Sequence, residues 1–145
     1  MNRPTVYLAG HVHDDWRARV AGILKTWGYA VTAPHDDVDR VGGLPAEQYM
    51  VRDLLAIRQA DIVLTWFDLS KPYKYVGTSA ECGLAKGLGK ILLVAISGAP
   101  EPGTSEYAGA ASYEFPAGLA DRVYPSLDAA LDALHSAVER NGWAS

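Results

Sequence analysis

The chain alternates between short, continuously apolar segments and longer segments in which apolar residues recur every three or four positions. Apolar runs without alternation are typical of parallel strands that are covered on both faces. Recurrence every three or four positions predicts amphipathic helices with one apolar stripe. The predicted strands are residues 5–9, 29–33, 61–67 and 91–96, and the predicted helices are residues 14–27, 45–59, 79–88 and 125–142.

Strands and helices that alternate along a chain indicate a parallel sheet with helices on both faces. Two further segments, residues 113–115 and 122–124, are predicted to be short edge strands. A chain of 145 residues is long enough to bury a core without disulfides. The sequence therefore predicts an α/β fold: a single doubly wound, flavodoxin-like domain over residues 1–145, with a mostly parallel five-stranded sheet.

The charge balance narrows the choice of ligand. With 13 basic and 17 acidic residues, the net charge of −4 offers no basic surface for a nucleic acid polymer or an anionic membrane. The first apolar stretch, residues 6–9, is too short for a signal peptide or a membrane span. One cysteine, Cys82, excludes an internal disulfide and favours a reducing compartment. We expect a cytoplasmic protein that binds small molecules.

One carboxylate, Glu81, stands where the strand over residues 61–67 gives way to the next helix. Ligands of open α/β sheets bind beyond the carboxyl ends of the strands, so Glu81 is the candidate nucleophile. A helix N-terminus favours negative charge, and an ionised carboxylate there can attack an electron-poor carbon. The competing interpretation is a capping box, Thr78-x-x-Glu81, in which Glu81 only satisfies the start of the helix.

An ionised Glu81 cannot donate a proton, so a proton donor would have to be a second carboxylate in a different environment. Two such carboxylates are the minimum for acid and base roles at a glycosidic bond. The nearest candidates for the second are Asp53, on the preceding predicted helix, and Asp68, at the end of the strand.

Several of these residues form a pattern with recognisable order and spacing. It comprises Tyr7 in Val-Tyr-Leu-Ala-Gly, Asp53 eight residues before Asp61, and Glu81 within Gly-Thr-Ser-Ala-Glu-Cys-Gly-Leu-Ala, residues 77–85. Over residues 4–96 the chain resembles the nucleoside 2-deoxyribosyltransferase superfamily. That superfamily also contains deoxynucleoside monophosphate N-glycosidases and pyrimidine nucleotide hydrolases.

The resemblance implies a role for each residue of the pattern. Glu81 would attack the anomeric carbon of the sugar, Asp53 would assist departure of the base, and Tyr7 would orient Glu81. The implied reaction cleaves the N-glycosidic bond of a (deoxy)nucleoside or nucleotide through a covalent glycosyl-glutamate. The 2-deoxyribosyl group then passes to a free nucleobase or to water, with no cofactor. Other expected substrate-binding residues are Gly10, His11, Trp16, Asp61, Asp68, Tyr75, Gly77 and Ser79.

The resemblance also implies a homodimer or larger homo-oligomer, in which residues 98–112 would help to complete a neighbouring pocket. The chain departs from the family pattern at Tyr75, where transferases often carry an aspartate that holds the base. The acidic residues within the segment 11–17 would disfavour a phosphate, whereas Arg17, Lys71 and Lys74 would offset them. The sequence leaves the 5′ substituent open.

Three other interpretations compete for the same residues. A metal site would need His11, His13, His35, Asp36 and Asp37 to gather at the strand ends. Because His-x-His alone is a weak pattern, no metal is predicted. Cys82 has no base that the sequence identifies, so a thiol nucleophile is disfavoured. A ligand-sensing module of the same fold is the remaining alternative, and the joint presence of Tyr7, Asp53 and Glu81 favours an enzyme.

Overall fold

The structure is a computed structural model, and it describes residues 3–11, 15–32, 46–71, 75–98 and 113–141. Its strands are β1 Thr5–Gly10, β2 Ala30–Thr32, β3 Ile62–Asp68, β4 Ile91–Ser97 and β5 Arg122–Tyr124. Its helices are α1 Trp16–Thr26, α3 Ala46–Gln59, α4 Val76–Gly87, α6 Glu114–Leu119 and α7 Leu127–Asn141.

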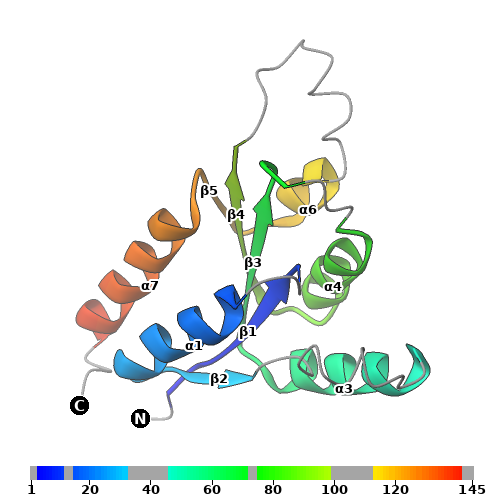
Figure 1. The fold of residues 1–145 in the computed structure, drawn as a ribbon. Coiled ribbons are helices and arrows are strands. Elements are labelled where there is room, and N and C mark those ends of the chain that lie inside the picture. The colour runs from blue at the N-terminus through cyan, green and yellow to red at the C-terminus, as the bar shows by residue number, and fades with distance from the viewer. Residues whose placement is uncertain (1–2, 12–14, 33–45, 72–74, 99–112, 142–145) are drawn as a thin grey trace.

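The five strands form one sheet in the order β2-β1-β3-β4-β5, and all four neighbouring pairs are parallel. Helices α1 and α7 cover one face, while α3, α4 and α6 cover the other (Figure 1). The doubly wound α/β fold predicted from the alternation of strands and helices is therefore confirmed. The sheet is parallel throughout, as expected where each strand returns through a helix.

Successive residues of the central strands enter opposite core layers. In β1, Val6 and Leu8 pack under α1 and α7, whereas Tyr7 and Ala9 pack under α3 and α4. Both layers are apolar, which explains the absence of alternation along the strands. The same geometry directs the side chain of Tyr7 toward the α3 and α4 face.

Two aspartates at the amino-terminal edge of the sheet form the same pair of hydrogen bonds with a neighbouring strand. The Asp61 carboxylate accepts the Thr5 N–H at 2.8 Å, and the Asp61 N–H donates to the Thr5 carbonyl at 2.8 Å. Asp121 repeats both bonds with Leu92, at 2.7 Å and 2.8 Å. Each aspartate precedes a strand and pairs with the neighbouring strand, so this pairing sets the parallel register.

One predicted strand is wrong. Residues 113–115 do not join the sheet; Tyr113 precedes α6, which begins at Glu114. Tyr113 is buried in the layer beneath α4, while Phe115 is 73% exposed. A three-residue apolar-polar-apolar window fits a strand or a helical turn equally well. Pro116 falls in the first turn of α6, where a missing N–H costs no helical hydrogen bond.

Among the helices that the structure describes, none combines the length and the apolar character needed to cross a membrane.

Candidate active site

The centre of the site is a hydrogen bond between β1 and α4. Tyr7 is completely buried, and its hydroxyl donates to Oε2 of Glu81 at 2.5 Å. Burial raises the pKa of Tyr7 far above its ordinary value of 10.0, and the charges of Glu81 and Asp53 raise it further. The phenol therefore keeps its proton at neutral pH and acts as a donor to the Glu81 carboxylate.

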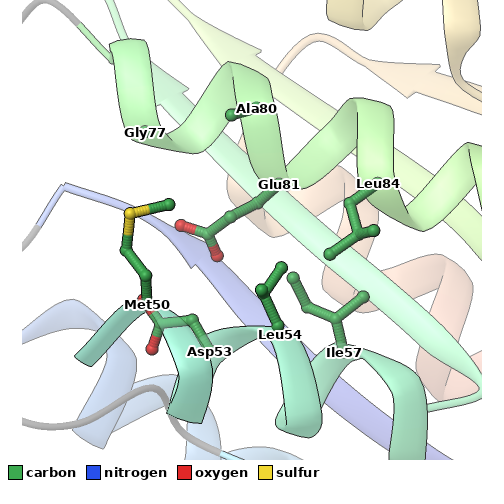
Figure 2. Close-up of a pocket in the computed structure, with 8 residues that line it drawn as sticks. All are labelled: Met50, Asp53, Leu54, Ile57, Gly77, Ala80, Glu81 and Leu84. Atoms are coloured by element: carbon green, nitrogen blue, oxygen red, sulfur yellow. The ribbon is translucent and has the colours of Figure 1, made fainter. Parts of the chain in front are cut away.

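A pocket of about 280 Å³ lies beside this hydrogen bond, between α3 and α4 (Figure 2). Two carboxylates line it, Asp53 and Glu81, and the other lining residues are apolar or glycine. The lining is Met50, Asp53, Leu54 and Ile57 from α3, with Gly77, Ala80, Glu81 and Leu84 from α4. On both helices the lining residues recur every three or four positions, so the pocket forms where two helix stripes face each other.

The two carboxylates occupy different settings in this pocket. Asp53 is only 7% exposed, on the middle turn of α3, whereas Glu81 is half-buried. The charge of Asp53 acts on Tyr7, as the charge of Glu81 does. The pocket thus combines a hydroxyl donor, two carboxylates and an apolar wall.

The position of Glu81 within α4 corrects the capping interpretation. The helix begins at Val76, three residues earlier than predicted, and its N-cap is Tyr75 without a side-chain capping bond. Thr78 and Glu81 therefore lie inside the helix, and the capping box is wrong. The macrodipole falls off within the first turn, so the expected N-terminal stabilisation of Glu81 is wrong as well. The environment of Glu81 is set by Tyr7 and the pocket instead.

Tyr75 does not line the pocket, contrary to its expected role beside the substrate. Its backbone is left-handed, with φ 54° and ψ 28°, a conformation that costs an L-residue about 1–2 kcal/mol. Its side chain is 6% exposed, and its hydroxyl bonds both the N–H and the carbonyl of Asp68. Asp68 does not line the pocket either. Its carboxylate accepts hydrogen bonds from the N–H and the hydroxyl of Ser70, at 3.1 Å and 2.6 Å.

Gly10, His11 and Trp16 form a packed cluster at the end of β1. A Cβ at position 10 would lie 2.5 Å from Cζ2 of Trp16, so only glycine fits beneath the indole. Trp16 is 1% exposed, and its indole N–H donates to the His11 carbonyl at 2.9 Å. The His11 ring lies 5.6 Å from the Trp66 ring and is buried. This placement makes the three residues part of the protein's packing, and none of them lines the pocket.

Of the eight residues expected to bind substrate, Gly77 lines the pocket. Ser79 lies half-buried on α4 outside the lining, with its N–H bonded to the Tyr75 carbonyl. Asp61 lies at the amino-terminal edge, bonded to Thr5, and the structure does not bring it to the pocket. The three residues expected to be catalytic, Tyr7, Asp53 and Glu81, are brought together.

Sequence reasoning did not assign the apolar lining to the site. The helical spacing of Met50, Leu54 and Ile57 predicts an apolar side that packs in the core, yet Met50 is 51% exposed and Leu54 is 41% exposed. A signal was present in that helix, because Val51 and Leu55 form a second apolar row beside the first. An apolar surface wider than one stripe indicates more than core packing.

Cys82 is a packing residue next to the nucleophile candidate. Its Sγ lies 3.3 Å from Oγ1 of Thr65, and burial raises the pKa of the thiol to about 11. The thiolate form needed for a nucleophile is therefore scarce at neutral pH. The structure shows no metal-binding group of three His, Cys, Asp or Glu within the ranges it describes. His13, residues 35–37 and most of residues 98–112 lie outside those ranges.

Fold and pocket together define a doubly wound α/β protein with a dicarboxylate pocket between two helices on one face of its sheet. No protein-family model matches the chain, and no curated protein matches it. Solved structures do match. A 2-desoxiribosyltransferase from Leishmania mexicana is 21% identical, with a TM-score of 0.66, over 92% of this chain and 97% of that chain.

Two further solved structures have the same architecture. A conserved protein from Enterococcus faecalis V583 is 14% identical, with a TM-score of 0.70, over 94% of this chain and 99% of its own. The CMP N-glycosidase BcmB from Clostridium botulinum is 17% identical, with a TM-score of 0.53, over 92% of this chain and 98% of its own. At these identities the matches establish the fold of the chain.

Proposed function

We propose that the protein cleaves the N-glycosidic bond of a (deoxy)nucleoside or nucleotide through a covalent glycosyl-Glu81 intermediate. The observation that carries the proposal is the hydrogen bond from buried Tyr7 to Glu81, in a pocket that Asp53 also lines. A structural carboxylate has no need of a second carboxylate beside it in a largely apolar pocket. A raised pKa, such as that of Tyr7 beside these carboxylates, is typical of functional sites.

The reaction has two halves. In the first, a Glu81 oxygen attacks C1′ of the sugar, and the electron pair of the broken C1′–N bond leaves with the base. The transition state is oxocarbenium-like, so the Glu81 anion stabilises it from one face while Asp53 assists the departing base. In the second half, a free nucleobase or a water molecule attacks C1′, and the Glu81 carboxylate is released.

Tyr7 would act by orientation. The phenol sits on a central strand with its ring fully buried, and its bond to Oε2 fixes the rotation of the Glu81 carboxylate. A carboxylate fixed before substrate arrives loses less freedom in the transition state. Because the pKa of Tyr7 is raised, this bond persists across the neutral and mildly alkaline range.

The apolar part of the pocket suits the base. Met50, Leu54 and Leu84 present aliphatic and thioether groups next to Glu81, and such surfaces pack against planar rings. The half-buried Arg17, on the first turn of α1, is close enough for its charge to act on Tyr7. Arg17 is therefore the candidate cation for a substrate that carries a 5′-phosphate.

The names of the fold neighbours agree with this chemistry. One is a 2-desoxiribosyltransferase and another is a CMP N-glycosidase, so both act on the bond between a sugar and a base. The match in fold joins the match in motif residues, Tyr7, Asp53 and Glu81. Transfer and hydrolysis differ only in what attacks the glycosyl-enzyme.

A chromatographic assay tests the proposal. The protein is incubated with a panel of deoxynucleosides and their 5′-monophosphates, with and without a second free base, alongside Glu81→Ala. Free base released by the wild type and absent from Glu81→Ala would establish glycosidic cleavage, and a new nucleoside would make the protein a transferase. Ligand binding without turnover anywhere in the panel would contradict the proposal and favour a sensing module.

A homo-oligomer is also proposed, because several large apolar side chains of α3 and α4 are exposed in the part of the chain that the structure describes. Met50, Val51, Leu54, Leu55 and Val76 are each between 41% and 73% exposed. An apolar surface of this kind beside a pocket is typical of an interaction surface. Light scattering after gel filtration would show a dimer or larger species, whereas a monomer would refute this part. The cytoplasmic location stays a prediction of the sequence.

A further inference from the structure

Tyr75 is the one non-glycine residue with a positive φ in the part of the chain that the structure describes. It is the N-cap of α4, and its ring is buried. A residue with a Cβ stays in the left-handed region only where its surroundings hold it there. The helix that carries Glu81 therefore begins at a residue that is held by contacts beyond its own backbone preference.

The contacts that hold Tyr75 come from the end of β3. Its hydroxyl accepts the Asp68 N–H at 2.9 Å and donates to the Asp68 carbonyl at 3.0 Å. Its ring lies 5.0 Å from the Phe67 ring. The Tyr75 side chain thus connects the N-cap of α4 to the last residue of β3, seven positions earlier.

These hydrogen bonds of Tyr75 precede the candidate nucleophile, Glu81, by less than two helical turns. The Tyr75 carbonyl accepts the Ser79 N–H at 2.9 Å, which is the first turn of α4, and Glu81 follows on the next turn. A second contact between α4 and β3, Cys82 to Thr65 at 3.3 Å, lies on the far side of Glu81. Glu81 is therefore bracketed by two contacts with the strand that neighbours β1, which carries Tyr7.

We propose that Tyr75 is a positioning residue whose hydroxyl bonds to Asp68 set the start of α4 so that Glu81 meets Tyr7. The kinetic consequence of this role rests on the proposed function, whereas the contact itself does not. Loss of the hydroxyl would let the first turns of α4 shift, and a shift of about 1 Å at a reacting group costs roughly 100-fold in rate. The role differs from that of a base-holding residue, because Tyr75 acts through Glu81.

The test compares Tyr75→Phe with Tyr29→Phe. Tyr29 is a matched control, since its buried hydroxyl also bonds a backbone carbonyl, that of Leu134 at 2.7 Å, in the opposite core layer. The protein is labelled with ¹³C at tyrosine Cζ, and the Tyr7 resonance is assigned with Tyr7→Phe. Glu81→Gln supplies the position of that resonance when the Glu81 charge is lost. Steady-state kinetics are measured in parallel.

In Tyr75→Phe the Tyr7 resonance should move toward its Glu81→Gln position, while Tyr29→Phe should leave it in place. In Tyr75→Phe kcat should fall roughly 10- to 100-fold with KM within about twofold, and Tyr29→Phe should keep both. If Tyr75→Phe does not fold, Tyr75→Asn replaces it, because asparagine tolerates the left-handed region. An unmoved Tyr7 resonance would overturn the positioning role. A moved resonance in a protein without turnover would uphold it and refute the proposed function.

Discussion

Carboxylates serve two purposes in this molecule, and the contrast between the amino-terminal edge of the sheet and the α3–α4 pocket separates them. At the edge, Asp61 and Asp121 each accept one backbone N–H of a neighbouring strand, and both residues are exposed. In the pocket, Asp53 is buried and Glu81 is half-buried, and Glu81 is bonded to a phenol. The edge carboxylates satisfy the backbone, whereas those of the pocket face a space that a ligand can fill.

The difference matters because burying two like charges in one pocket is unfavourable for folding. Water and backbone donors stabilise an exposed carboxylate at little cost, but a carboxylate beside apolar walls loses hydration. Both pocket charges also act on Tyr7, which raises the pKa of that group. We infer that the arrangement is retained for chemistry rather than for stability.

The largest effect is expected from Glu81→Gln. The amide keeps the size of the side chain and removes the nucleophile, so turnover should fall at least about 1,000-fold while substrate binding persists. Calorimetric binding and single-turnover assays measure the two quantities. Asp61→Asn is the matched control from the edge, and it should keep wild-type turnover. Equal losses in the two variants would erase the distinction between pocket and edge.

Tyr7→Phe should come second. Removing the hydroxyl frees the rotation of Glu81, so kcat should fall roughly 10- to 100-fold with a small change in KM. The same variant should alter alkaline stability. The raised pKa means that folded Tyr7 keeps its proton while the unfolded chain loses it above about pH 10, so wild-type stability falls as pH rises past that value. Urea unfolding between pH 8 and about 11 should show a shallower fall in Tyr7→Phe, and parallel curves would contradict the coupling.

A smaller effect is expected from Gly77→Ala, with Gly87→Ala as its control. An added Cβ would meet no atom within 4 Å at either position on α4. Both changes should raise the melting temperature, because alanine favours a helix by up to about 1 kcal/mol over glycine. Of the two glycines only Gly77 lines the pocket, so only Gly77→Ala should raise KM, by a few-fold. Identical KM values would show that the substrate does not contact this wall.

Asp121→Asn should have the smallest effect, confined to acid. The hydrogen bond from the Leu92 N–H holds the pKa of Asp121 below its usual value, and Lys86 contributes. A lowered pKa adds stability that is present above the unfolded pKa of about 3.9 and is lost as pH falls toward the folded value. Thermal melts between pH 7 and about 3 should show a weaker acid dependence in the variant, with unchanged activity at neutral pH. Lost activity in Asp121→Asn would contradict a purely structural role for this carboxylate.

The central strands could be predicted from sequence because both of their faces are buried, so β1, β3 and β4 read as continuous apolar runs. The three candidate catalytic residues, Tyr7, Asp53 and Glu81, could be chosen from the sequence because their order and spacing are recognisable, and the structure brings them together. The start of α4 could not be predicted, because it depends on the left-handed backbone of Tyr75, which hydrogen bonds to Asp68, seven positions earlier, hold in place. A short stretch of sequence does not show such a contact.

The apolar walls of the pocket were harder to predict than its two carboxylates. Met50 and Leu54 sit at helical spacing, and the same spacing describes a core stripe and a pocket wall. Trp16, which the resemblance implies to be a substrate-binding residue, does not line the pocket. Its indole instead fills the space above Gly10, and only the three-dimensional packing reveals that.

The most direct test of the account is to look for the covalent intermediate. The protein is mixed with a deoxynucleoside or deoxynucleotide that it turns over, quenched in acid during the first turnover, and analysed by intact-mass and peptide mass spectrometry. One added 2-deoxyribosyl group, or its 5′-phosphate, is expected on the peptide that contains Glu81, and no adduct is expected in Glu81→Gln. Turnover with the adduct on another residue, or turnover retained in Glu81→Gln, would contradict it.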